Sequence, residues 1–224
     1  MKGLLGNAFA PLTFEVGFLE ASFDKVHEAT LEWRRGQFFA TVEATEVKGP
    51  LSELLRGLEP FCKLGRRDLI LETRSHWTAR FDSAADATSW TGHLASVLGC
   101  RGVLVRCAPD TNLMYGGVKL DLLGPERREW LNYVRSICAS KDGDRWRFDA
   151  VGEVQPFEQI EKYKTRKIAD RFTPDMLEQY CAAFGIALFD GTFYGPRGAL
   201  IVCRPPENEV GITLAELRRR AGLE

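Results

Sequence analysis

The sequence predicts an α+β protein: a single domain over residues 1–224, with a mixed or mainly antiparallel sheet, helices on one face and a helical C-terminal third. Three observations predict this class. Hydrophobic residues make up 45% of the chain and charged residues 27%, as in globular proteins, and 224 residues can bury a sizeable core. Consecutive strand patterns with a hairpin turn favour α+β over a doubly wound sheet. No low-complexity linker divides the chain.

The predicted strands are segments in which apolar and polar side chains alternate, or short apolar runs. In the first of them, Phe14, Val16 and Phe18 share one face. The pair Asp142-Gly143 favours a tight hairpin, because glycine accepts the positive φ that such turns require. In chain order, the expected strands are 12–21, 38–45, 67–73, 76–81, 102–108, 116–123, 130–139, 145–148 and 199–203.

The predicted helices begin at residues that can cap a first turn and end at glycines. Ser22 offers a cap, and Gly36 is expected to end that helix in the left-handed conformation. Thr173 and Pro174 combine a cap with proline at the first helical position. The segment 83–86 resembles a capping box. The expected helices are 22–36, 51–58, 83–99, 157–171, 173–185 and a last one from residue 213.

Net charge argues against a general nucleic-acid binder. The chain carries 30 basic and 31 acidic residues, for a net charge of −1, whereas a protein that neutralises phosphates needs a basic excess. One basic segment, 162–171, has tyrosine interleaved. On the predicted helix, Lys164, Lys167 and Arg171 would share one face at i, i+3 and i+7 and could bind an acidic partner or a phosphate. The alternative is a solvated helix face of mixed charge.

Arg197 is a further candidate binding residue. It lies in the glycine-rich stretch 191–198, where it could meet an anion. This stretch lacks the strand–loop–helix context that aims backbone N–H groups at a phosphate, so the alternative is an ordinary turn before a strand.

Motifs for cofactors and metals are absent from the sequence. Neither G-x-x-x-x-G-K-[ST] nor a G-x-G-x-x-G after a strand occurs, so no cofactor is expected. The six cysteines form no C-x-x-C pair, and no metal site is expected. Several of them lie in apolar runs, which indicates buried, reduced thiols.

Two residues are weak candidates for catalysis. No G-x-S-x-G motif occurs, and a catalytic triad would have to use one of three histidines. His76 starts a predicted strand and is the histidine best placed for the edge of a cleft. Asp110 follows an apolar strand, where a rigid support can hold a functional side chain. The alternative for Asp110 is a purely local role in a turn.

The expected location is the cytoplasm. The N-terminus faintly resembles a signal peptide, but its apolar region is too short and is interrupted by Asn7 and Pro11. No stretch approaches the roughly 18 apolar residues that a membrane span requires.

Two stretches, 131–158 and 163–186, are similar to a group of soluble bacterial proteins of unassigned function. The resemblance is carried by 134–136, by the hairpin that ends in 146–148, and by 155–158 and 170–173. These proteins in turn resemble immunity-like proteins of bacterial toxin systems. The resemblance implies a protein partner and supplies no catalytic residue.

Three functions follow from these observations. The first is a protein-binding module, of the immunity type, that neutralises a bacterial toxin by direct binding; it needs only a rigid surface with a few aromatic or arginine anchors. The alternative is a hydrolase or transferase with a dispersed active site that includes His76 or Asp110. The third is a regulatory or nucleic-acid-associated protein that uses the 162–171 segment.

Overall fold

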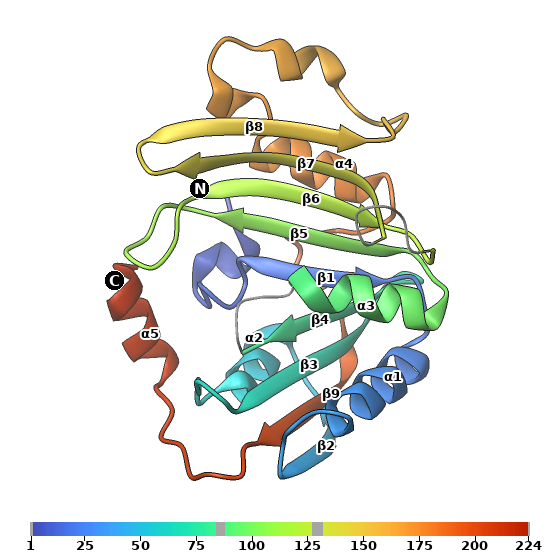
Figure 1. Ribbon diagram of the computed structural model, residues 1–224, viewed down its shortest axis with the longest axis vertical. Coiled ribbons are helices and arrows are strands. Elements are labelled where there is room, and N and C mark those ends of the chain that lie inside the picture. The colour runs from blue at the N-terminus through green and yellow to red at the C-terminus, as the bar shows by residue number, and fades with distance from the viewer. Residues whose placement is uncertain (1, 84–87, 127–131, 224) are drawn as a thin grey trace.

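Nine strands of the residues that the structure describes form one sheet, in the order β2-β9-β3-β4-β1-β5-β6-β7-β8 (Figure 1). The structure is a computed structural model that describes residues 2–83, 88–126 and 132–223. Every neighbouring pair is antiparallel, which confirms the α+β class with an antiparallel sheet. The strands are β1 (Glu15–Leu19), β2 (Thr41–Lys48), β3 (Arg66–Thr73), β4 (Thr78–Asp82), β5 (Gly102–Ala108), β6 (Gly117–Leu123), β7 (Tyr133–Asp142), β8 (Arg145–Gly152) and β9 (Tyr194–Arg204).

Helices lie on both faces of this sheet. The α-helices are α1 (Phe23–Arg35), α2 (Leu51–Leu54), α3 (Thr88–Leu98), α4 (Pro174–Ala182) and α5 (Leu214–Ala221). The 3-10 helices are η1 (Leu4–Asn7), η2 (Leu55–Leu58), η3 (Ile160–Lys164) and η4 (Ile168–Asp170). Helices α1 and α3 pack together over one face, and α2, η2 and α4 pack against the other (Figure 1). The prediction that the helices cover one face is wrong.

The central strands explain why both faces are covered. Leu69, Ile70 and Leu71 follow one another in β3, and all three are buried. Leu69 and Leu71 belong to the larger core, with α2 and α4, whereas Ile70 belongs to the smaller core, with α1 and α3. A strand that is apolar on both sides must be covered on both sides.

The last strand corrects the prediction of a helical C-terminal third. Strand β9 has 11 residues and lies between β2 and β3, so this third supplies an inner strand of the sheet. It begins at Tyr194 and includes most of the stretch 191–198 that resembled a turn. At Gly195 and Gly198 an added Cβ would lie 2.8 Å from a β3 carbonyl oxygen, that of Glu72 or Ile70. Glycine is used at these positions because two backbones approach closely there.

The predicted helix 157–171 is also wrong. The segment contains only η3 and η4, and Lys167 between them is extended. The cause lies in tertiary contacts. Arg135 of β7 donates from Nε and Nη2 to the Glu158 carboxylate, at 2.9 and 2.6 Å, and Tyr163 donates to the same group at 2.9 Å. These bonds hold the start of the segment against the sheet, so Lys164 does not share a helix face with Lys167 or Arg171.

Helix ends follow the predicted chemistry in part. Thr173 Oγ1 accepts a hydrogen bond from the Met176 N–H at 3.3 Å, and Pro174 is the first residue of α4, as predicted. Gly36 ends α1, but its φ of −76° is not left-handed, so that detail of the prediction is wrong. Its N–H bonds to the Glu32 carbonyl and continues the helical pattern.

Two predictions fall partly outside the described residues. The capping box expected at 83–86 extends into 84–87, and the strand expected at 130–139 begins within 127–131. None of the helices that the structure does describe is long and apolar enough to cross a membrane.

Candidate functional site

The two predicted catalytic residues lie at opposite ends of β5. His76 Nε2 is 3.3 Å from Glu20 Oε1, and Glu20 also pairs with Arg101, immediately before β5. Asp110 follows the other end of the strand, accepts a hydrogen bond from the Gly116 N–H at 2.7 Å and pairs with Lys141. The seven residues of β5 separate these sites by about 20 Å. His76 and Asp110 therefore share no active site.

The predicted lysines pair with their own neighbours. Lys164 Nζ lies 3.1 Å from Glu161, and Lys167 Nζ lies 3.1 Å from Asp170. Both pairs are exposed, as in a solvated surface of mixed charge.

The two predicted arginines are also engaged within the chain. Arg171 Nε donates to the Thr165 carbonyl at 2.8 Å. Arg197 lies on β9 among three carboxylates, at 3.0 to 3.3 Å, those of Asp24, Glu46 and Glu72. Arg197 is therefore neutralised within the chain, whereas Arg171 is engaged by a carbonyl group and by no acid of the described residues.

Metal binding finds no support within the described ranges. No group of three or more His, Cys, Asp and Glu side chains converges there as a metal site would require.

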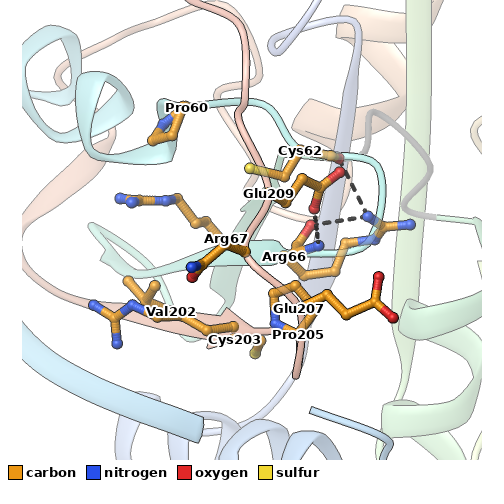
Figure 2. Close-up of a pocket in the computed structure, with 12 residues that line it drawn as sticks. Pro60, Cys62, Arg66, Arg67, Val202, Cys203, Pro205, Glu207 and Glu209 are labelled. Atoms are coloured by element: carbon orange, nitrogen blue, oxygen red, sulfur yellow. Dashed lines mark hydrogen bonds between the residues drawn. The ribbon is translucent and has the colours of Figure 1, made fainter. Parts of the chain in front are cut away.

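A different set of arginines lines a cavity of about 210 Å³ between the start of β3 and the end of β9 (Figure 2). Twelve residues form its wall. Its charged and thiol-bearing residues are Cys62, Arg66, Arg67, Cys203, Arg204, Glu207 and Glu209. We call this the arginine pocket.

Arg67 is the central cation of the arginine pocket. Its Nη1 donates to the Gly57 carbonyl at 3.0 Å, and no carboxylate of the described residues pairs with it. Partial burial lowers the pKa of Arg67, and the nearby Arg204 lowers it further, although Cys62 opposes this. An anion bound beside Arg67 would offset this cost of burial.

Arg66 likewise bonds to carbonyl groups rather than acids. Its Nη1 donates to the Lys63 and Gly65 carbonyls at 2.7 and 2.9 Å. Arg204 does have an acidic partner, Glu43 of β2, at 2.7 Å. Arg66 adds to the backbone hydrogen bonds that lower the pKa of Glu209, so Arg67 is the pocket guanidinium that has no carboxylate partner among the described residues.

Glu209 fixes the chain that follows β9 as one wall of the arginine pocket. Its carboxylate accepts hydrogen bonds from the N–H groups of Lys63, Leu64 and Gly65, with Leu64 at 3.0 Å and Gly65 at 2.9 Å. Figure 2 shows Glu209 among the residues that line the pocket. These backbone bonds, with Gly65 first, lower the pKa of Glu209. Three successive N–H groups that converge on one carboxylate form an anion-binding nest, which here is filled from within the chain.

The thiols of the pocket are poor nucleophiles. Burial raises the pKa of Cys62, and Glu209 adds to this. Burial raises the pKa of Cys203 to about 12, and Asp68 adds to this. Because the thiolate is the reactive form, the pocket offers cations for binding rather than a nucleophile for catalysis.

Alkylation should reveal these thiols directly. At pH 8 we expect iodoacetamide to label Cys203, and also Cys107, whose pKa burial raises to about 11, at least about tenfold more slowly in the native chain than in urea. Peptide mass spectrometry over time gives the rate at each cysteine. Equal rates in both states would contradict the assignment of protonated, buried thiols.

A second cavity, of about 300 Å³, is lined in part by Trp77, the residue after His76, but not by His76 itself. It is lined mainly by apolar side chains, among them Trp77, Val103, Leu122 and Phe184, together with Arg101. The His76 ring lies 5.5 Å from that of Trp77. His76 therefore lies next to a residue that lines a cavity, whereas Asp110 does not line this cavity.

Sequence reasoning missed the arginine pocket. The adjacent arginines 66 and 67 were visible at the start of a predicted strand, but their isolation from acids depends on the fold.

Comparison with protein-family models, with curated proteins and with solved structures returned no match.

Proposed function

We propose that this chain is a protein-binding module whose arginine pocket receives an acidic side chain of the partner. We further propose that it is of the immunity type and neutralises a bacterial toxin in the cytoplasm by direct binding. The observation that carries the proposal is Arg67, a part-buried cation in the arginine pocket with no described carboxylate partner.

Arginine at a part-buried position suits recognition of a carboxylate. The planar guanidinium can donate two parallel hydrogen bonds to it, and reduced contact with water strengthens them. Two exposed apolar residues adjoin the pocket-lining segments: Leu64 is 47% exposed and Val210 is 98% exposed. A cation in a pocket with an apolar rim resembles a binding hot spot.

A protein partner fits this site better than a nucleic acid does. Glu207 and Glu209 also line the pocket and would repel a run of phosphates more strongly than a single carboxylate. The net charge of −1 supports the same choice.

We expect the substitution Arg67→Met to weaken binding of the partner about tenfold to hundredfold, because one charge-assisted hydrogen-bonded contact is lost. The partner to test is the product of the neighbouring gene, purified and titrated calorimetrically into the full chain. Arg166→Met is the matched control, since Arg166 is exposed and lies in the 153–171 segment, away from the pocket. Unchanged affinity for Arg67→Met, or no stoichiometric complex with the unsubstituted chain, would refute the proposal.

A hydrolase or transferase is the second candidate, and the His76–Glu20 pair next to Trp77, which lines the 300 Å³ cavity, favours it. The two functions predict different effects of the substitution His76→Gln. For the binding module, His76→Gln should leave toxin neutralisation unchanged. For the enzyme, the same variant should abolish turnover of the small polar substrate that the unsubstituted chain converts.

A further inference from the structure

Strand β2 is an edge strand with an open side. Its eight residues pair with β9 in an uninterrupted register, from Thr41 opposite Arg204 to Lys48 opposite Arg197. On its other side, no strand of the described chain pairs with it, and it lies at one end of the sheet in Figure 1. Most of its residues are exposed.

The register shows which backbone groups point outward. The Gly49 N–H bonds to the Pro196 carbonyl, so the odd-numbered positions of β2 bond to β9. Because antiparallel strands alternate, the N–H and C=O groups of the even-numbered positions point away from the sheet. These positions are Val42, Ala44, Glu46 and Lys48.

This edge has few of the features that usually prevent edge pairing. Between Thr41 and Lys48 it contains no proline and no register shift, although the Ala40 N–H just before it also bonds to the Arg204 carbonyl. Its two acids are neutralised by β9, Glu43 by Arg204 and Glu46 by Arg197. The opposite edge strand, β8, differs. The 153–171 segment packs against it, with Tyr163 on Phe148 at 5.0 Å between ring centroids, and arches beside it in Figure 1.

We infer that β2 is a dimerisation edge, on which β2 of a second copy of this chain adds as an antiparallel strand. A two-fold axis perpendicular to the sheet would pass between the two Ala44 residues and join the sheets into one. In this register an even-numbered residue always lies opposite an even-numbered residue, for example Val42 opposite Glu46 of the second copy. The outward N–H and C=O groups of the two strands therefore face each other. Glu43 lies opposite Thr45 of the second copy, so no two acids oppose each other, which makes the edge complementary to itself.

Phe38 supplies an apolar anchor for this contact. It lies three residues before β2, is 67% exposed and stacks only on Phe39, at 4.9 Å between ring centroids, among the described residues. In the register centred on Ala44, each Phe38 lies just beyond one end of the paired strands. The pairing therefore completes the hydrogen bonds of two strands and places an exposed aromatic ring near each end of the contact.

The test is the oligomeric state of the full chain and of two proline variants, by sedimentation velocity from about 1 μM to about 1 mM. Ala44→Pro removes an outward N–H and should leave the β9 pairing intact. Ala150→Pro is the matched control on β8: the Glu153 N–H bonds to Val134, so position 150 also points outward. We expect dimers for the unsubstituted chain and Ala150→Pro, and monomers for Ala44→Pro. A monomeric unsubstituted chain, or a dimeric Ala44→Pro, overturns the inference.

A cysteine variant tests the register without altering the backbone. Facing residues in an antiparallel pair have Cα atoms about 4.5–5.5 Å apart, within the range of a disulfide. Under mild oxidation, Ala44→Cys should give a covalent dimer, whereas the unsubstituted chain and Ala150→Cys should not. A dimer that Ala44→Cys fails to cross-link would place the contact elsewhere and overturn the inference. Neither result bears on the arginine pocket, which lies on other residues.

Discussion

Replacing Asp68 by asparagine should lower the free energy of unfolding by about 3–5 kcal/mol, because buried Arg34 loses its carboxylate partner and buried Arg80 loses one of two, keeping Asp82 at 3.4 Å. The Asp68 side chain is 0% exposed. Arg34 of α1 donates to it from Nε and Nη2, at 2.6 and 2.9 Å, and Arg80 of β4 donates from Nη2. The Arg34 guanidinium also lies 4.2 Å from the centre of the Trp90 ring. This one carboxylate therefore joins α1, β3 and β4.

The matched control is Asp142→Asn, the same chemical change at an exposed pair. Asp142 lies 2.7 Å from Arg147, with both side chains at least 60% exposed. Solvent and salt screen such pairs, so little change is expected. Urea unfolding of both variants, followed by tryptophan fluorescence, gives the two free energies. Similar small changes for both would show that Asp68 is not needed to neutralise Arg34 and Arg80.

Asp68 should also contribute to the acid sensitivity of the chain. Burial is the largest influence and raises the pKa of Asp68, but Arg80 and Arg34 together outweigh it and hold that pKa below its ordinary 3.8. A carboxylate with a lowered pKa contributes stability above the unfolded-state value and loses it as pH falls through the folded-state value. Asp68→Asn should therefore flatten the fall in stability below about pH 4.

Local patterns predicted the elements that are governed by neighbours in sequence. Alternating side chains predicted most strands, and Thr173 with Pro174 predicted the start of α4, because these signals act within a few residues. The same patterns failed for β9, where Gly195 and Gly198 looked like turn residues. These glycines allow the β9 backbone to lie close to the backbone of β3, which is more than 120 residues earlier in the chain. Neighbouring residues in the sequence give no sign of that contact.

The site was harder to predict than the fold because charge pairing is non-local. Arg197 looked available in sequence, but the fold surrounds it with three carboxylates from α1, β2 and β3. Arg67 stands next to Asp68 in sequence, yet neighbours in a strand point to opposite faces, so Asp68 neutralises other arginines. Which arginine is left unpaired is therefore decided by the sheet.

The resemblance noted in the sequence falls on packing residues. Arg135 and Glu158, which lie within the stretches 134–136 and 155–158, form a buried ion pair. Phe157 packs on Phe184 at 5.0 Å between ring centroids. These stretches explain how the 153–171 segment is attached, so they describe a scaffold rather than a site of chemistry.

Replacing Glu158 by glutamine should cost about 3–5 kcal/mol, because Arg135 would keep its charge in a buried site without an anion. The side chains of Glu158 and Arg135 are 0% and 4% exposed. Glu158 also accepts hydrogen bonds from the Gln155 N–H at 2.8 Å and from Tyr163, whose hydroxyl lies 3.1 Å from that of Tyr180 in α4. The loss should therefore be concentrated in the 153–171 segment.

Glu161→Gln is the control within the same segment, since Glu161 is 78% exposed and pairs only with Lys164 among the described residues. Hydrogen exchange by mass spectrometry separates local from global effects. We expect faster exchange over 153–171 in Glu158→Gln and an unchanged pattern in Glu161→Gln. If Glu158→Gln exchanged like the unsubstituted chain, the segment would be held by its aromatic contacts, such as Phe148 with Tyr163, and the ion pair would serve only to neutralise Arg135.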